Sequence, residues 1–425
     1  MGLGKIGLPL AVQYASKGHF VQGVDINHKT VELVNAGLEP FPGELDLKER
    51  LGEQVACGRL SATTQTDRAV SGSEVVVVAV PLFVDEKALP DFMAMDVATL
   101  EIGKSLSPGT LVCYETTLPV GTTRNRLTPT LERESGLKAG EDFFVVFSPE
   151  RVLTGRVFAD LRKYPKLVGG INEISEAKGV AFYEEVLDFD PRPDLPKPNG
   201  VWSLGSAEAA EMAKLAETTY RDVNIGLANQ FAIQAEAVGV DIYKIIEACN
   251  SQNYSHIHKP GVAVGGHCIP VYPHLYLQGD PSATIVSAAR EANKAMPSHV
   301  ISKVEQALGN LEGKRVAILG LAYRGGVKEH AFSGAWDLIQ ELRHKKATPL
   351  VNDPMYSNEE LEAMGLDSFT FGAPCDAAII QTDHASFKAL TKEDVPLARF
   401  LVDGRNISSA SLRSQIPTYV VGIGA

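Results

Sequence analysis

The N-terminal part of the chain alternates short apolar runs with segments of helical periodicity. The run at 75–80, Val-Val-Val-Val-Ala-Val, is continuous and β-branched, as expected of a parallel strand buried on both faces. Alternation of this kind predicts a doubly wound α/β sheet in residues 1–200, with an irregular proline-rich connection at 191–198. The other strand-like runs lie at 20–24, 111–114 and 143–147.

Residues 201–300 have helical periodicity instead. Lys214, Thr218 and Arg221 lie at i, i+4 and i+7, on the stripe opposite to the apolar positions of one long helix. A polar row of this kind usually faces water, but it could line a site if the helix joined two domains. We therefore expect a central helical domain with a long helix. Its apolar stripe consists of Met212, Tyr220, Val223, Leu227 and Phe231.

The third segment, 313–425, returns to α/β alternation. A strand-like run at 314–320 ends in a glycine turn, and a helical stretch around 336–342 follows it. The whole chain thus predicts an α/β protein with two doubly wound, Rossmann-like domains joined by the central helical domain. Its further strands are expected at 350–351, 377–380 and 400–402.

A glycine pattern at the start of the chain predicts a dinucleotide site. Gly2, Gly4 and Gly7 would let a pyrophosphate approach a helix N-terminus closely. Asp25, at the end of the next strand, would accept a hydrogen bond from a ribose 2′-hydroxyl and repel a 2′-phosphate, which favours NAD. The strand that should precede Gly2 is absent. We expect the start at Met1 to lie several residues too late, since a sheet without its central strand would leave its neighbours unpaired.

One cysteine lies in a glycine-rich loop, Gly-Gly-His-Cys-Ile-Pro at 265–270. The two glycines allow the backbone to approach a ligand, and a neighbouring imidazolium could activate the Cys268 thiol as a nucleophile. Most unpaired cysteines are merely small buried hydrophobes, so this loop alone leaves both interpretations open. We expect no metal, because the nearby histidines match no zinc pattern. They are His256, His258, His267 and His274.

Composition excludes several classes of protein. The formal net charge of -12 and the lack of a basic patch argue against a nucleic-acid partner. The longest apolar run, 75–84, is roughly half of what a membrane-spanning helix needs, so no membrane partner is expected. The five scattered cysteines form no Cys-x-x-Cys pair, which favours a reducing cytoplasm.

Taken in order, these motifs resemble the nucleotide-sugar 6-dehydrogenases, the family of UDP-glucose and UDP-N-acetylmannosamine dehydrogenases. The resemblance covers nearly the whole chain, and several motifs occur in the order in which the family has them. They are Gly2 to Gly7 with Asp25, Glu-Thr-Thr-Leu-Pro-Val-Gly at 115–121, Ser-Pro-Glu-Arg-Val-Leu at 148–153, Lys-Leu-Ala-Glu at 214–217 with Tyr-Arg-Asp-Val-Asn-Ile at 220–225, the cysteine loop at 265–270, and Leu-Gly-Leu-Ala-Tyr at 319–323.

The resemblance implies oxidation of the C6 alcohol of a UDP-sugar to a carboxylate, with two NAD used in succession. Cys268 would form a thiohemiacetal and then a thioester, and Lys214 would stabilise oxyanion character. Thr117 and Glu150 would orient water and assist proton transfer. The family also implies a homodimer that packs through the long helix. The residues implied to bind the UDP-sugar are Arg151, Arg221, Gly265, Gly266 and Arg324.

Some positions depart from the family pattern. Tyr272 stands four residues after the cysteine, where the family usually has Asp, and Thr218 stands four residues after Lys214, where it usually has Asn. Tyrosine is a poor base near neutral pH, so we hypothesise that Glu150 carries more of the base function. After Tyr323 the chain also lacks the acidic pair and arginine that the family more often has, which affects the expected UDP contacts.

The motifs around Glu150 and Arg221 look most like the UDP-N-acetylmannosamine branch. We therefore favour an N-acetylhexosamine substrate, destined for a polysaccharide, with UDP-glucose as the alternative. A catalytically impaired nucleotide-sugar-binding homologue is a second alternative, suggested by Tyr272, Thr218 and the missing strand. A β-hydroxyacid dehydrogenase is disfavoured, because it needs neither a thiol nor a third α/β domain.

Overall fold

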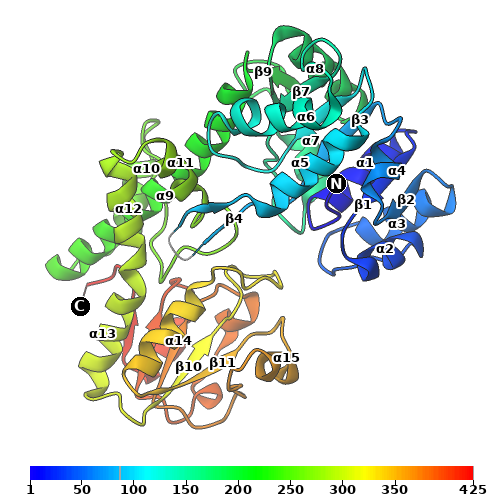
Figure 1. Cartoon of the computed structure of the whole chain (residues 1–425). Helices are drawn as coiled ribbons and strands as arrows, with labels where there is room; N and C mark the ends of the chain where they lie inside the picture. The colour runs from blue at the N-terminus through cyan, green and yellow to red at the C-terminus, as the bar shows by residue number, and fades with distance from the viewer. Residues whose placement is uncertain (86–87, 425) are drawn as a thin grey trace. The chain divides into compact units, whose positions relative to one another are not determined.

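The protein is described by a computed structural model that covers residues 1–85 and 88–424 (Figure 1). The chain divides into two compact units. The first comprises residues 1–217 with 274–279, and the second comprises 218–273 with the residues from 280 onward.

The first unit is built on a five-stranded sheet of order β3-β6-β7-β8-β9 and a separate parallel pair, β1-β2. Strands β3, β6 and β7 are parallel, whereas β8 runs antiparallel to β7. The strands are β1 (Val21–Val24), β2 (Leu60–Thr63), β3 (Val75–Val78), β6 (Leu111–Tyr114), β7 (Phe144–Phe147), β8 (Lys166–Gly170) and β9 (Val201–Ser203), with a short hairpin of β4 (Phe83–Val84) and β5 (Pro90–Asp91).

Helices cover this sheet. Leu10 and Tyr14 of α1 and Tyr183 of α8 share one apolar core with Cys113 and Val146 of the sheet. The helices are α1 (Gly7–Ser16), α2 (His28–Asn35), α3 (Leu47–Ala56), α4 (Thr66–Val70), α5 (Met93–Ser105), α6 (Thr128–Ser135) after a π-helical turn at Thr123–Leu127, α7 (Val157–Lys163) and α8 (Glu173–Val186).

Met1 and Gly2 lie between β1 and β3. The Met1 ammonium donates to the Val77 carbonyl at 2.9 Å, and Ala79 N donates back to the Met1 carbonyl at 2.9 Å. On the other side, Gly2 N donates to the Val24 carbonyl at 2.8 Å. In the described part of the chain, these two residues therefore link the β1-β2 pair to the larger sheet. Burial lowers the pKa of the Met1 ammonium to about 6, against the opposing charges of Asp25 and Glu115.

The second unit contains an all-parallel sheet of order β11-β10-β12-β13-β14. This is a doubly wound order whose direction reverses between β10 and β12, the position at which such sheets bind ligands. The strands are β10 (Arg315–Leu319), β11 (Thr348–Asn352), β12 (Ala377–Ile380), β13 (Phe400–Asp403) and β14 (Thr418–Val420).

One face of this sheet packs against α9, α13 and α14 through residues such as Ala232, Val300 and Leu338. The other face packs against Phe387 and Leu412. The remaining helices of the chain are α9 (Ala207–Val238), α10 (Ile242–Asn250), α11 (Tyr272–Gly279), α12 (Thr284–Lys294), α13 (Met296–Leu308), α14 (Gly334–His344), α15 (Asn358–Ala363) and α16 (Ala410–Gln415), with 3-10 turns at Ala385–Ala389 and Lys392–Asp394. Residues 207–217 of α9 and 274–279 of α11 belong to the first unit.

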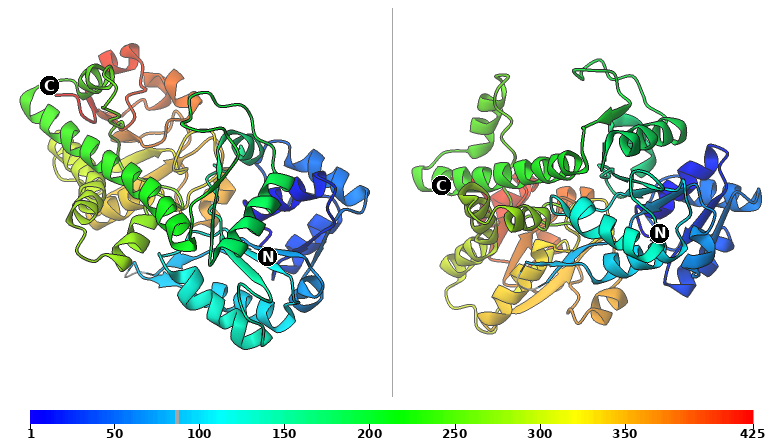
Figure 2. Two further views of the ribbon diagram at one scale, coloured as in Figure 1. Left: turned by 90° about the horizontal axis from the view of Figure 1, so that it is seen from above. Right: turned by 45° about the horizontal axis from the view of Figure 1, so that its top comes forward.

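Helix α9 continues without a break for 32 residues, and it is the long green helix in both views of Figure 2. Two doubly wound sheets, helices between them in the sequence and one long helix confirm the predicted fold class. None of the described helices is both long and apolar enough to cross a membrane.

Candidate functional site

The glycine turn at the start of the first unit has the close contacts that a dinucleotide-binding turn requires. Gly2 has φ +83°, and a Cβ on Gly7 would lie 1.8 Å from the Gly2 carbonyl oxygen. A Cβ on Gly4, in contrast, would meet nothing within 4 Å. No side chain caps the N-terminus of α1, which follows this turn. The turn therefore fits a pyrophosphate approaching the N–H groups at the start of the helix.

Asp25 borders the same turn. Leu3 N donates to Asp25 Oδ2 at 2.8 Å, and Asn27 N donates to Oδ1 at 2.9 Å. These two bonds hold the carboxylate at the end of β1, next to the glycines. This is the placement that a residue accepting from a ribose hydroxyl needs. The residues present therefore fit NAD.

Three predicted catalytic residues belong to the first unit, two of them after the carboxyl ends of β6 and β7 and the third in α9. Thr117 follows β6 and Glu150 follows β7, so the two parallel strands end at one edge of the sheet. Lys214 of α9 donates from Nζ to the Glu150 carbonyl oxygen at 2.6 Å. Lys214 is only 7% exposed and Thr117 only 4%. The structure thus brings Lys214 and Glu150 into contact in a buried setting.

Helix α9 also holds the loop that follows Thr117. Glu211, three residues before Lys214, accepts hydrogen bonds from Gly121 N at 2.5 Å, Thr123 N at 2.8 Å and Thr123 Oγ1 at 2.7 Å. Burial raises the pKa of Glu211 to about 7, although the three hydrogen bonds oppose this shift. Residues three apart lie on one helix face, so one stretch of α9 holds both catalytic loops of this unit.

Two of the three residues in the polar row of α9 do not face water. Lys214 and Thr218 are buried, whereas Arg221 is exposed. The apolar stripe is instead the exposed one, with Tyr220 58% and Leu227 43% exposed. Burial, with a smaller contribution from the charge of Arg221, lowers the pKa of His258.

One charged residue that the sequence did not single out, Lys166, contacts Glu150. Lys166, the first residue of β8, forms an ion pair with Glu150 and another with Glu115, which follows β6. A lysine at the start of a strand ordinarily reaches water, so its own position gave no sign of a buried ion pair. Glu115 could have given one, because its acidic side chain directly follows the apolar run at 111–114 and would need a cation if it were buried. Arg151 forms an ion pair with Glu217 at 3.0 Å.

The cysteine loop lies in the second unit and packs against the segment that follows β10. A Cβ on Gly265 would lie 2.6 Å from the Tyr323 Cβ and 2.9 Å from the Phe332 carbonyl oxygen. Gly266 has φ +95° and donates from N to the Ala331 carbonyl at 3.1 Å. Both glycines are thus required for a close approach between two backbones.

Cys268 is partly exposed, and its carbonyl accepts from Tyr272 N at 2.8 Å at the start of α11. The neighbouring His267 Nε2 lies 3.4 Å from Glu329 Oε2. Arg324 Nε donates to the Tyr323 hydroxyl at 3.1 Å, so this arginine stands beside the ring on which Gly265 and Gly266 pack. The structure therefore gathers Cys268, its two glycines and Arg324 in one region of the second unit.

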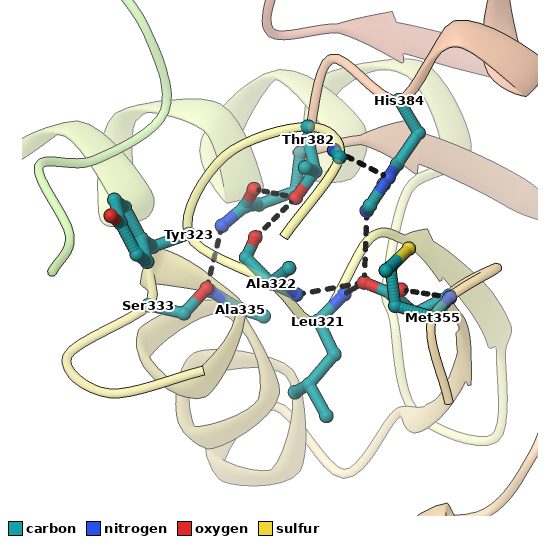
Figure 3. Close-up of polar contacts among 12 residues, drawn as sticks. Leu321, Ala322, Tyr323, Ser333, Ala335, Met355, Thr382 and His384 are labelled. Atoms are coloured by element: carbon teal, nitrogen blue, oxygen red, sulfur yellow. Dashed lines mark hydrogen bonds and ion pairs between the residues drawn. The ribbon is translucent and has the colours of Figure 1, made fainter. Parts of the chain in front are cut away.

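A buried hydrogen-bond network fixes the turn that carries Tyr323 (Figure 3). Asp353 Oδ2 accepts from Leu321 N at 2.7 Å, from Ala322 N at 2.8 Å and from His384 Nε2 at 3.1 Å. Thr382 Oγ1 donates to the Ala322 carbonyl at 2.5 Å. Burial disfavours the charged form of Asp353, but its hydrogen bonds outweigh this cost and lower the pKa of the carboxyl. The turn thus lies rigidly at the point where the strand order reverses.

The described residues include no group of three His, Cys, Asp or Glu side chains that could hold a metal ion. The first unit offers two lysines and paired carboxylates together with a dinucleotide turn, and the second unit offers a thiol. Such a set suits covalent catalysis with hydride transfer to a cofactor.

Comparison with known proteins gives the same order of domains. Residues 1–187 match the NAD binding domain of the UDP-glucose/GDP-mannose dehydrogenase family, residues 208–295 its central domain and residues 317–410 its UDP binding domain. The chain is 34% identical over 417 residues to UDP-N-acetyl-D-mannosamine dehydrogenase of Pyrococcus horikoshii, covering 96% of this chain and 94% of that one.

Other relatives carry related names. NDP-N-acetyl-D-galactosaminuronic acid dehydrogenase of Ralstonia nicotianae is 31% identical over 426 residues, covering 96% of each chain. A solved structure of UDP-D-ManNAc dehydrogenase from Pyrococcus horikoshii superposes with a TM-score of 0.88 at 31% identity, covering 100% of this chain and 98% of that one. The chain therefore belongs to the UDP-glucose/GDP-mannose dehydrogenase family of NAD-dependent oxidoreductases.

Proposed function

We propose that this enzyme oxidises the C6 alcohol of a UDP-N-acetylhexosamine, UDP-N-acetyl-D-mannosamine in the first place, to the uronic acid for polysaccharide biosynthesis. The observation that carries the proposal is the packing of the Cys268 loop on the Tyr323–Arg324 turn of the UDP binding domain. This packing places a partly exposed thiol beside the part of the chain that would hold the nucleotide. The names of the relatives support the N-acetylated sugar.

Covalent attachment to Cys268 explains how an alcohol becomes an acid in one enzyme. After the C6 alcohol has lost a hydride and a proton, the Cys268 sulfur adds to the aldehyde carbon and its proton passes to the carbonyl oxygen. Loss of a second hydride and proton from this thiohemiacetal gives a thioester. Water then adds to the thioester carbon, the C–S bond breaks and the thiol is restored. NAD bound by Gly2, Gly4, Gly7 and Asp25 supplies the hydride acceptor in each oxidation.

The other side chains act on protons and on oxyanions. Lys214 would stabilise negative charge on the reacting oxygen. Thr117 and Glu150 would orient the water, and Glu150 would take its proton, because Tyr272 replaces the usual acid after the cysteine. Arg151, Arg221, Arg324 and the glycines at 265–266 would bind the UDP-sugar.

The test is a panel of UDP-sugars with NADH and acid measured together. We expect two NADH for each uronic acid formed, with N-acetylated sugars preferred over UDP-glucose. Activity on UDP-glucose alone would identify a UDP-glucose 6-dehydrogenase instead. No NADH with any sugar, from protein that still binds UDP, would identify an impaired homologue.

The same proposal assigns residues 1–200 to NAD, 201–300 to dimerisation and the cysteine, and 313–425 to the UDP-sugar. It also places the reaction in the cytoplasm, which is supported by five cysteines that are all free in the structure.

We also propose a homodimer formed through α9. Tyr220, Leu227, Phe231 and Val238 are all exposed, and at 100° per residue they fall within about 40° of one another. Single exposed apolar residues are ordinary, but an aligned row of about 27 Å is typical of an interface.

Replacing Leu227 and Phe231 together by Glu should convert the dimer to a monomer, because it would bury like charges against each other. Light scattering after gel filtration measures this change. Ile285→Glu, at an exposed position of α12, serves as the control and should leave the mass unchanged. A wild-type monomer, or a doubly substituted dimer, would contradict the proposal.

A further inference from the structure

The first unit contains a buried charge cluster around Lys166. Its side chain is only 4% exposed and lies between the carboxylates of Glu115 and Glu150, which are 1% and 9% exposed. Lys166 Nζ donates to Glu150 Oε1 and lies 3.3 Å from Glu115 Oε2. The cluster arises because β8 runs antiparallel to β7, so that its first residue lies beside the segments that follow β6 and β7.

Two tyrosines complete the cluster from the helices that cover the sheet. Tyr183 of α8 donates to Glu115 Oε1 at 2.6 Å, and Tyr14 of α1 donates to the same oxygen at 3.2 Å. The Lys166 ammonium also lies 4.6 Å from the centre of the Tyr183 ring, in reach of a cation–π interaction. Glu115 is thus anchored by groups that do not contact Glu150, and it can hold Lys166 in place.

The charges of the cluster keep the lysine ionised. Burial disfavours the ammonium, but Glu115 and Glu150 outweigh this effect and raise the pKa of Lys166 above its ordinary value. Burial raises the pKa of Glu115, and the lysine charge opposes that shift. Two carboxylates therefore share a single ammonium in a place from which water is largely excluded.

Two lysines bind Glu150, one at its backbone carbonyl and one at its carboxylate, and one carboxylate oxygen accepts no hydrogen bond from the described residues. Lys214 binds its carbonyl oxygen, and Lys166 binds carboxylate Oε1. Among the described residues, Oε2 accepts no hydrogen bond although it is buried. A buried acceptor without a partner is costly unless something binds there, so Oε2 is the oxygen of this carboxylate whose hydrogen-bonding capacity is still unused.

We propose that Lys166 is a positioning residue that fixes the Glu150 carboxylate with Oε2 turned to the water that hydrolyses the thioester, and that Glu115 anchors Lys166. This inference rests on the proposed role of Glu150. Lys166 itself touches neither the substrate nor the cofactor in this scheme. Its loss should therefore slow the hydrolysis and spare the two oxidations.

The test replaces Lys166 by Met, which keeps much of the volume and removes the charge. We expect kcat to fall about tenfold to a hundredfold, because Lys166 acts only through Glu150 and a positioned proton-transfer group itself contributes about 10²–10⁴-fold. Rapid mixing with UDP-sugar and NAD should then show a burst of two NADH per active site before slow turnover. The acid limb of the pH–rate profile should move to higher pH, since loss of the ammonium removes the charge that opposes the raised pKa of Glu115.

A second variant separates positioning from folding. Lys166→Met leaves two carboxylates unbalanced, so Lys166→Met with Glu115→Gln should recover thermal stability but not kcat. Lys166→Arg keeps the charge, so the burst of NADH expected for Lys166→Met should be absent from this variant. Recovery of wild-type kcat in the double variant would show a purely structural lysine and overturn the inference. Equal slowing of the first NADH formed and of turnover would do the same.

Different results would contradict the proposed function and the positioning role of Lys166. If Cys268→Ser still formed acid with two NADH, no thioester would exist, whatever the Lys166 variants did. If Cys268→Ser lost acid formation while Lys166→Met kept wild-type kcat and pH profile, only the positioning role would fail.

Discussion

Cys268→Ser is expected to lower uronic acid formation by about 10³-fold or more, the scale seen when a catalytic nucleophile is removed. A serine hydroxyl is far less ionised than a thiol near neutral pH, so it is the weaker nucleophile at this position. Without a covalent intermediate, the second oxidation has no thiohemiacetal to act on. Acid is measured by chromatography and NADH by absorbance in the same reaction.

Cys249→Ser provides the matched control. Cys249 is also partly exposed and lies in the same unit, in α10 away from the glycine loop. It should keep acid formation within about twofold of wild type, as surface substitutions usually do. Equal loss in both variants would mean that Cys268→Ser had damaged the fold rather than the chemistry.

Gly7→Ala is expected to cost both NAD affinity and stability. Its Cβ would lie 1.8 Å from the Gly2 carbonyl oxygen and 3.3 Å from the Ala79 Cβ, so the turn and the start of α1 must separate. We expect the Kd for NAD to rise by about 10²-fold and the melting temperature to fall by several degrees, since strained core sites cost about 1–3 kcal/mol. NAD titration and thermal unfolding measure the two effects.

Gly4→Ala is expected to lower NAD affinity without lowering stability. Its Cβ would meet no atom of the protein within 4 Å, so the melting temperature should stay unchanged. The methyl group would nevertheless occupy the space that the pyrophosphate needs, and NAD should bind about tenfold more weakly. Gly279→Ala, also open within 4 Å but at the end of α11, should change neither quantity. NAD binding by Gly4→Ala at wild-type strength would place the cofactor elsewhere.

The strands that the sequence predicts best are continuous apolar runs, which are stable only when both faces are buried. The runs at 111–114 and 377–380 coincide with β6 and β12, because continuous apolar segments of this length are buried on both faces. Strand β8 escaped prediction because it starts with a lysine and ends in Gly169 and Gly170. Those glycines reflect packing: a Cβ on Gly169 would lie 1.9 Å from the Ser206 carbonyl oxygen. Such contacts exist only once the sheet has formed.

In the candidate site, too, local sequence predicts some features, whereas others depend on the folded sheet. Local spacing is enough to indicate the glycine turn and the cysteine loop, since each is a property of a few consecutive residues. The contact of Lys166 with Glu115 and Glu150 depends instead on the order and direction of three strands. For α9, amphipathic periodicity located the helix but would have assigned Lys214 to water. Amphipathic periodicity predicts that the apolar stripe of a helix is buried. The exposed apolar stripe of α9 would agree with that prediction only if a partner covered it.

The hold of α9 on two loops has a consequence for the timing of the reaction. In the proposed reaction, which uses two NAD on one substrate, a reduced cofactor must leave while the sugar is still attached. Glu211 and Lys214 bind the segments around Gly121 and Glu150 through protein groups alone. None of these bonds uses an atom of the cofactor. If the proposed function holds, we expect the segments around Gly121 and Glu150 to stay held while one nicotinamide is exchanged for the next.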